Sequence, residues 1–290
     1  MKSALIKLHL AVFLWGFTGV LGRLIQLNEG LLVWYRLIIT ITSLLFIFKV
    51  RNTFEQVAKP TRFKLMSIGI LVALHWVFFY GSIKYANVSI SLICLSCIAF
   101  FTSLLEPMIV KSKLKPIEIL LSLIGVAGVA LIFHFDNKYR VGILLGLISA
   151  LFSALFSTYN KKNVSAASSQ SIMLYELIGG LIFLTVLMPF YLKLLPTAHL
   201  FPNAKDIMWL LLLSWVCTVV AMDLSLQALK KVSAFTQNLT LNLEPVYGII
   251  LAFIIYHEQK ELSPTFYYGF ALIILSVALQ MLRIAQRRSN

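Results

Sequence analysis

The chain has 290 residues, of which 60% are hydrophobic and only 12% are charged, and its mean hydropathy is +0.89. A water-soluble domain carries about 25% charged residues, so this composition excludes a large soluble core and indicates a protein of the lipid bilayer. The net charge of +14 does not indicate nucleic acid, because the basic residues stand in small groups between apolar runs. We expect no nucleic-acid partner.

Ten apolar runs follow one another along the chain, each long enough to cross about 30 Å of hydrocarbon as a helix. They cover residues 4–24, 31–50, 64–86, 88–110, 116–135, 141–160, 170–192, 207–229, 234–256 and 264–284. The first run lacks a cleavage site and is too long for a signal peptide, so we expect it to be a retained span. The sequence therefore predicts an all-α integral membrane protein with ten transmembrane helices.

The basic residues predict the orientation of these spans. Most Lys and Arg residues fall in the connections that share a side with the N-terminus. Because cytoplasmic loops carry the excess of positive charge, we expect both termini in the cytoplasm of a multi-pass protein of the cytoplasmic (inner) membrane.

The two halves of the chain show a weak internal similarity in a constant order. Trp34 to Ile38 (WYRLI) matches Leu174 to Ile178 (LYELI), and Val88-Ser89 matches Val232-Ser233. Five spans per half is an odd number, so the second half would enter the membrane from the opposite side. The sequence predicts two inverted five-helix repeats, residues 1–137 and 138–290, with a site between them near the midplane. Chance similarity between apolar helices is the alternative.

Glu244, followed at once by Pro245, is the most unusual group within the apolar runs. It lies roughly 15 Å below the inner start of its span. Pro245 lacks an N–H and frees a carbonyl one turn back, a helix break that membrane helices tolerate beside water or neighbouring helices. We expect this break to line a wet pocket together with three preceding polar residues, Gln237, Asn238 and Asn242. Glu244 is then a binding or coupling group, and we hypothesise that it titrates and couples transport to protons. The alternative is a protonated carboxyl that serves only packing.

An aromatic segment around His75 predicts another wall of the pocket. His75 lies roughly 16 Å deep in its span, while Trp76 and Tyr80 are one turn apart on one helix face. Trp15, beside Gly16 in the first run, is a further candidate for the cavity wall. Aromatic walls with a few polar anchors are typical of small-molecule sites. Ordinary packing of an aromatic helix is the alternative.

Three more ionisable residues lie within the spans. Arg36 and Glu176 occupy matching repeat positions, yet their depths differ by roughly 13 Å, which argues against a direct salt bridge. We expect all three to be gate or coupling residues. Arg36 would snorkel outward, and Glu176 and Asp223 would flank a cytoplasmic entrance. Glu106, near the end of its run, is expected at the membrane interface.

No catalytic, metal or cofactor site is expected. Cys94, Cys97 and Cys217 lie in apolar runs without a completing pair or His cluster, which indicates packing. His257-Glu258 begins like a zinc-protease signature, but Glu261 stands where the second histidine is required. We therefore do not expect an enzyme.

The chain resembles two EamA modules of the drug/metabolite transporter superfamily. The residues that carry the resemblance are Leu14-Trp15-Gly16, Tyr35-Arg36, Ala228 to Ala234, Leu243-Glu244-Pro245, Glu258 and Gly269. The resemblance implies a ten-helix inverted repeat, alternating access, a central cavity, and export or exchange of small metabolites such as amino acids. The first module departs from the pattern. Aligned without gaps, it places Phe101 opposite Pro245 and Leu114 opposite Glu258.

A secondary active transporter of small metabolites, with its cavity near Glu244 and His75, is the function that these observations favour. A channel-like facilitator and a carrier of lipids or lipid-linked metabolites are the alternatives, and the sequence identifies neither the substrate nor the oligomeric state.

Overall fold

The computed structural model describes residues 2–52, 55–135, 137–197, 199–241 and 243–289, and every regular element in these ranges is helical. The first half contains α1 (Lys2–Trp15), α2 (Thr18–Leu24), α3 (Glu29–Arg51), α4 (Lys59–Tyr85), α5 (Val88–Leu95), α6 (Ile98–Val110) and α7 (Pro116–Phe135). The second contains α8 (Arg140–Asn163), α9 (Ser169–Leu194), α10 (Ala204–Ser214), α11 (Ala221–Leu229), α12 (Ala234–Leu241), α13 (Glu244–Tyr256) and α14 (Pro264–Ser289).

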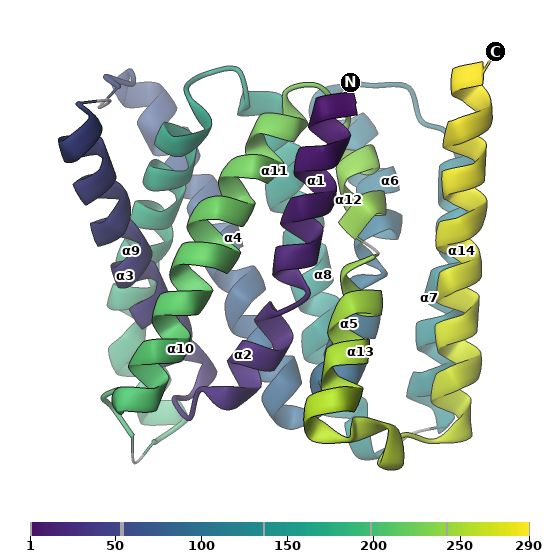
Figure 1. Cartoon of the computed structure of the whole chain (residues 1–290). Helices are drawn as coiled ribbons and strands as arrows, with labels where there is room; N and C mark the ends of the chain where they lie inside the picture. Colours follow the sequence, from purple (N-terminus) through teal and green to yellow (C-terminus); the bar gives the residue numbers. More distant parts are fainter. Residues whose placement is uncertain (1, 53–54, 136, 198, 242, 290) are drawn as a thin grey trace.

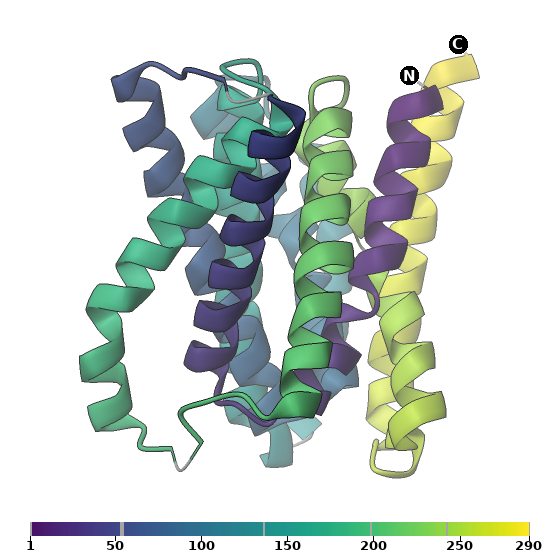
Figure 2. The same ribbon diagram turned by 60° about the vertical axis from the view of Figure 1, so that its left-hand side comes forward.

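The helices run along one common direction, and the two chain termini lie at the same end of the molecule (Figures 1 and 2). Within the described residues, eight helical segments are long and apolar enough to cross a membrane, and Glu244–Tyr256 and Pro264–Leu279 are shorter apolar helices. The prediction of an all-helical, multi-pass protein is confirmed. Ten spans remain a prediction, because the run 234–256 is divided into two helices that are each too short to cross alone.

Several of the expected spans are interrupted near mid-height. The interruptions lie at Gly16–Phe17 between α1 and α2, at Ser96–Cys97 between α5 and α6, and at Leu243 directly before α13. A π-helical segment, Trp215–Val220, separates α10 from α11. Such interruptions release backbone groups from the regular hydrogen-bond pattern, which a membrane protein tolerates where protein or an internal cavity can satisfy them.

Glycines allow the helices around these breaks to approach closely. A Cβ atom on Gly16 would lie 2.8 Å from the Cβ of Tyr247, at the crossing of α1 with α13. The tightest crossing joins α4 to α9, where a Cβ on Gly69 would lie 1.7 Å from the carbonyl oxygen of Glu176. At the edge of the molecule α7 and α14 run side by side (Figure 1), with Gly128 and Gly269 in mutual contact. Small residues of this kind position helices in membranes, where packing replaces the hydrophobic effect.

Candidate functional site

A cavity lies where the interrupted helices meet. Its wall combines side chains of α1 to α6, α8, α11, α12 and α13 with the π-helical segment. The cavity volume is about 70 Å³, which is enough for a few water molecules. Both halves of the chain therefore contribute to one small chamber near the middle of the molecule.

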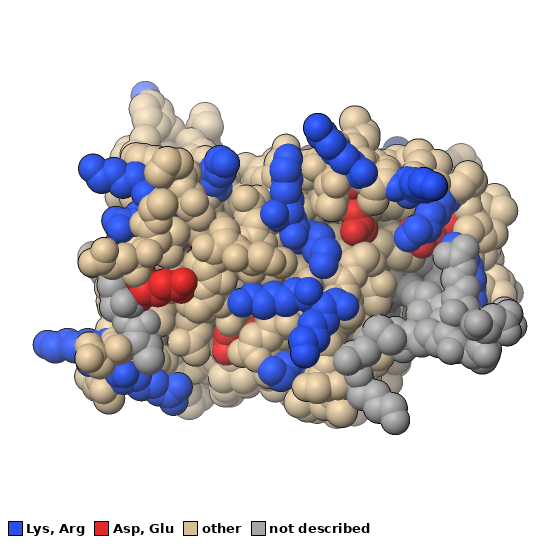
Figure 3. All heavy atoms as spheres, turned by 90° about the horizontal axis from the view of Figure 1, so that it is seen from above, with Lys and Arg blue, Asp and Glu red and all other residues tan. Residues whose placement is uncertain are grey.

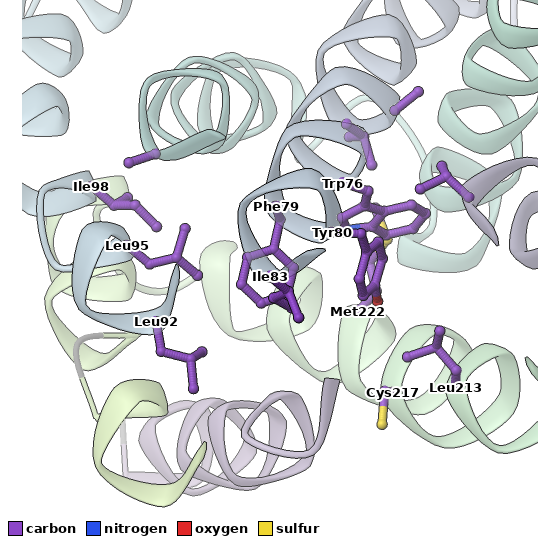
Figure 4. Packing of buried hydrophobic residues seen from close by; sticks show 14 of the residues in the cluster. Trp76, Phe79, Tyr80, Ile83, Leu92, Leu95, Ile98, Leu213, Cys217 and Met222 are labelled. Atoms are coloured by element: carbon purple, nitrogen blue, oxygen red, sulfur yellow. The ribbon is translucent and has the colours of Figure 1, made fainter. Parts of the chain in front are cut away.

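Arg36 of α3 is the charged group at the centre of this chamber. Its side chain is almost fully buried, at 2% exposure. Its Nε donates to the Thr218 hydroxyl (2.9 Å), and its Nη1 donates to the Tyr80 hydroxyl (2.8 Å). The guanidinium carbon lies 3.8 Å from the ring centroid of Trp76. Figure 4 shows Trp76 and Tyr80 on one side of α4, close to Met222. These contacts hold a cation in place at the cavity wall.

Glu244 brings a carboxyl group to the same cavity. It is the first residue of α13, its side chain is buried, and it lines the cavity together with Arg36 and with Thr18 of α2. Among the described residues Arg36 and Glu244 form no direct ion pair. The cavity is thus bordered by a guanidinium group and a carboxyl group that do not contact each other.

His75 and Trp15 also line the cavity, and each fixes a backbone crossing. The Nδ1 of His75 lies 3.0 Å from the carbonyl oxygen of Ser149 and 2.8 Å from its hydroxyl, which in turn donates to the carbonyl of His75. The indole N–H of Trp15 donates to the carbonyl of Cys217 in the π-helical segment (3.0 Å). The two side chains therefore join α4 to α8 and α1 to the π-helical segment at the level of the cavity.

The predicted polar residues before Glu244 separate into different environments. Gln237 lines the cavity. Asn238 is fully buried away from it and donates to the hydroxyls of Thr102 and Ser157, both at 2.7 Å. Asn242 lies outside the described residues. Pro245 is the second residue of α13 and is buried.

Glu176 and Asp223 do not line the cavity. Glu176 of α9 is completely buried, and neither of its carboxyl oxygens has a hydrogen-bond partner among the described residues. Asp223 of α11 accepts hydrogen bonds from the Ser169 hydroxyl and from the Gln227 amide. Their role at an entrance stays a prediction.

One of the sequence-based expectations is wrong. Arg36 does not snorkel outward, because Tyr80, Thr218 and the Trp76 ring satisfy its guanidinium inside the protein. The expectation rested on depth along the helix, and the direction of the side chain around the helix decided the outcome. Glu106 is buried in the protein, at 8% exposure, and its position at the membrane interface stays a prediction.

Glu106 belongs to a crosswise arrangement that the ungapped comparison of the two halves missed. Its carboxylate accepts from the backbone N–H groups of Ala234 (3.2 Å) and Phe235 (2.7 Å) at the start of α12. Glu258, after α13, accepts from the backbone N–H groups of Val88 (3.0 Å) and Ser89 (2.9 Å) at the start of α5. Each half therefore supplies a carboxylate to the positive N-terminal end of a helix in the other half.

The ungapped comparison had paired Glu258 with Leu114, so it hid this equivalence. Arg23 completes the Glu258 site through an ion pair with its carboxylate. The sequence match between Val88-Ser89 and Val232-Ser233 could have indicated these two carboxylate sites. Both pairs mark helix starts, where backbone N–H groups have no partner within the helix and can bind a carboxylate.

The comparisons with known proteins settle the family. The sequence model of the EamA-like transporter family matches residues 2–134 and 140–282. The chain belongs to the EamA-like transporter family. Its two matches account for nearly the whole chain and agree with the resemblance to the drug/metabolite transporter superfamily.

Curated relatives of this EamA protein include an "Uncharacterized transporter" of Haemophilus influenzae, 27% identical over 163 residues, or 53% of each chain. An "Uncharacterized transporter" of Helicobacter pylori is 27% identical over 192 residues, or 62% of each chain. The aligned part of the chain thus spans between about half and three-fifths of these relatives. A solved crystal structure aligns over 100% of both chains with a TM-score of 0.72 at 15% identity, which shows that the fold is shared. The chain therefore belongs to the EamA-like transporter family and shares a known overall fold.

Proposed function

We propose that this protein is a secondary active transporter of small metabolites that carry both a carboxylate and an amino group, such as amino acids. The observation that carries the proposal is that a buried arginine, Arg36, and a buried carboxyl group, Glu244, line one cavity. Ionisable groups are costly inside a membrane and mark substrate or ion pathways. Arg36 uses two of its five N–H donors on Tyr80 and Thr218, which leaves others for a substrate carboxylate. Glu244 would receive the ammonium group.

Alternating access is the mechanism that fits a chamber at the helix interruptions. The chamber is lined by both halves of the chain, and its volume is about 70 Å³. Tyr191 of α9 donates to the Glu29 carboxylate of α3 (2.6 Å), and Ser169 of α9 donates to Asp223 of α11. We expect the interrupted helices to be the elements that move, so that the chamber opens to one side of the membrane at a time.

The proposed architecture is ten spans in two inverted repeats, residues 1–137 and 138–290, with both termini in the cytoplasm. The common end of the two termini supports this topology, and so do the crosswise carboxylates Glu106 and Glu258. Lys and Arg side chains gather on the same end (Figure 3), as the excess of positive charge on the cytoplasmic side requires. The cytoplasmic membrane is then its location, and export is the direction that the family resemblance implies.

Glu244 is the proposed coupling group for protons. It is the carboxyl among the lining residues of the cavity, which it shares with Arg36 without a direct ion pair among the described residues. Protonation would release the substrate ammonium and change the charge of the chamber by one unit. If this is correct, the pH dependence of transport in wild type disappears in Glu244→Gln; the same pH dependence in both proteins would reject it.

A polar metabolite is favoured over a lipid substrate. A lateral groove between α3 and the π-helical segment opens to the membrane, but the residues that line it are all different from those of the central cavity. A carrier of lipids needs a lateral opening into its site. A channel needs a continuous path, whereas the chamber here is small, at about 70 Å³, and lined by large side chains such as Trp76 and Tyr80.

The proposal is tested by exchange in reconstituted vesicles. Purified protein is placed in liposomes loaded with a mixture of unlabelled amino acids, and accumulation of each labelled amino acid is followed. Arg36→Gln and Glu244→Gln should lower exchange at least tenfold, and the exposed control variants Arg140→Gln and Glu261→Gln should not. Esters and deaminated analogues, each lacking one charge, should not exchange. Exchange of such analogues as fast as of amino acids would refute the proposed substrate class, and uptake that depends neither on internal substrate nor on a proton gradient would indicate a channel.

A further inference from the structure

A second hollow lies on the outer surface between α4 and α8, at the end of the molecule that carries the termini. It has a volume of about 430 Å³, within the range of small-ligand sites. Its lining comes from the first turns of α4 and the last turns of α8, namely Lys64, Ser67, Ile68, Leu71, Tyr159, Lys162 and Asn163. It shares no lining residue with the central cavity, so it is a separate site.

The packing of α4 on α8 explains why the hollow exists. At the end opposite to the termini, α4 and α8 are in contact. A Cβ on Gly142 would lie 2.4 Å from the Cβ of Ala86, and the Ser82 hydroxyl donates to the Gly142 carbonyl (2.7 Å). Near the middle they are joined by the hydrogen bonds of His75 with Ser149. Beyond this crossing the two helices leave the space that forms the hollow. The fold therefore produces a wedge-shaped groove that opens toward the end with the termini.

The charges in this groove are of one sign. Lys64 and Lys162 contribute their ammonium groups from the two opposite helices. Within the described ranges no carboxylate lines the groove, and neither lysine forms an ion pair. The Tyr159 hydroxyl and the Ser67 and Asn163 side chains add hydrogen-bonding groups. A ligand with negative charge and several oxygen atoms matches this rim.

The floor of the groove has the opposite character. Ile68 and Leu71 line it, and Leu71 lies seven residues after Lys64 on the same helix, about 10 Å farther from the helix start. In a membrane-spanning helix this distance leads from the headgroup level into the hydrocarbon. The groove is thus cationic and polar at its rim and apolar below, which is the polarity order of a phospholipid.

We propose that the groove between α4 and α8 binds one anionic glycerophospholipid, with its phosphate between Lys64 and Lys162 and an acyl chain over Ile68 and Leu71. The basic end of the molecule favours the anionic leaflet (Figure 3). A soluble phosphate would match only the rim, whereas a zwitterionic lipid would bring a second cationic group close to Lys64 and Lys162. The bound lipid joins α4 to α8, the helices that also carry His75 and Ser149.

Native mass spectrometry of the full chain in non-ionic detergent tests this site. Dioleoyl phosphatidylglycerol or dioleoyl phosphatidylcholine is added to wild type, to Lys64→Ala/Lys162→Ala, and to the matched control Lys49→Ala/Lys113→Ala. All four lysines are exposed, so both double variants should fold, and thermal unfolding in lipid-free detergent verifies this. An ammonium near an anionic headgroup contributes about fivefold to affinity, so loss of both groove lysines should weaken phosphatidylglycerol binding about 30-fold. The control should bind like wild type.

Three outcomes would overturn the proposal. The first is equal retention of phosphatidylglycerol by the groove variant and the control. The second is retention of phosphatidylcholine as strong as that of phosphatidylglycerol, which would mark the groove as merely apolar. The third is displacement of the lipid by millimolar inorganic phosphate, which would show that a free anion occupies the rim.

Discussion

Gly69→Ala should separate α4 from α9 and destabilise the protein strongly. The added Cβ would lie 1.7 Å from the carbonyl oxygen of Glu176, and this neighbour is backbone, which cannot rotate away. Ordinary van der Waals contact begins at about 3.4 Å. The helices must therefore bend, or move apart by roughly the difference between 3.4 Å and 1.7 Å. Overpacking of this kind costs about 1–3 kcal/mol when a side chain can adjust. We expect about 3 kcal/mol or more here, well above the roughly 1 kcal/mol that Ala gains over Gly in helix propensity.

The same helix offers a matched control in Gly81→Ala. A Cβ on Gly81 would meet only the Leu145 Cδ1 at 3.5 Å and the Glu29 Cγ at 3.7 Å, which are ordinary contacts. This variant should be as stable as wild type or slightly more stable. Thermal unfolding of both variants in detergent, followed by tryptophan fluorescence, makes the comparison. Equal melting temperatures for Gly69→Ala and Gly81→Ala would refute the tight crossing.

Three more expected outcomes follow from single contacts. Glu258→Gln removes the charge that binds the start of α5, so it should lower stability by about 1–2 kcal/mol in thermal unfolding, unlike the exposed Glu261→Gln. Arg36→Lys keeps the charge but loses the planar fork, so amino-acid exchange should fall at least tenfold; unchanged exchange would contradict the assigned carboxylate site. The backbone N–H of Ser168 donates to Glu55 and holds the pKa of that carboxyl below its ordinary value. This contact therefore contributes stability above the unfolded-state pKa and loses it as pH falls through the folded-state pKa, so the extra hydrogen-exchange protection of Ser168 in wild type over Glu55→Gln should shrink in acid.

The sequence predicts the membrane helices well because hydropathy and length report directly on the hydrocarbon they cross. The run 31–50 corresponds to α3 and the run 116–135 to α7. The interruptions were harder to foresee. Pro245 indicates a break, but Ser96–Cys97 and the π-helical segment Trp215–Val220 contain no proline or other strong signal. Those breaks arise from tertiary contacts, which local propensity does not contain.

In the candidate site, too, some residues could be predicted from the sequence and others could not. Glu244, His75, Trp76 and Tyr80 were recognisable because polar and aromatic groups are conspicuous inside apolar runs, and the structure brings all four to one cavity. The partners of Arg36 were not recognisable, because Thr218 is separated from it by 182 positions. Asn238 was expected in the cavity wall and instead fixes α12 to α6 and α8.

The central claim is that water and substrate reach the chamber between the two halves, and the native cysteines provide the test. Cys217 lines the chamber, whereas Cys94 and Cys97 are buried away from it. A variant that keeps only Cys217 and one that keeps only Cys94, with the other cysteines replaced by Ser, are treated in liposomes with a small, charged methanethiosulfonate. We predict that the Cys217 protein is modified at least tenfold faster than the Cys94 protein, and that a transported amino acid slows this modification. Equal, negligible modification of both proteins would show a dry interior and contradict the account.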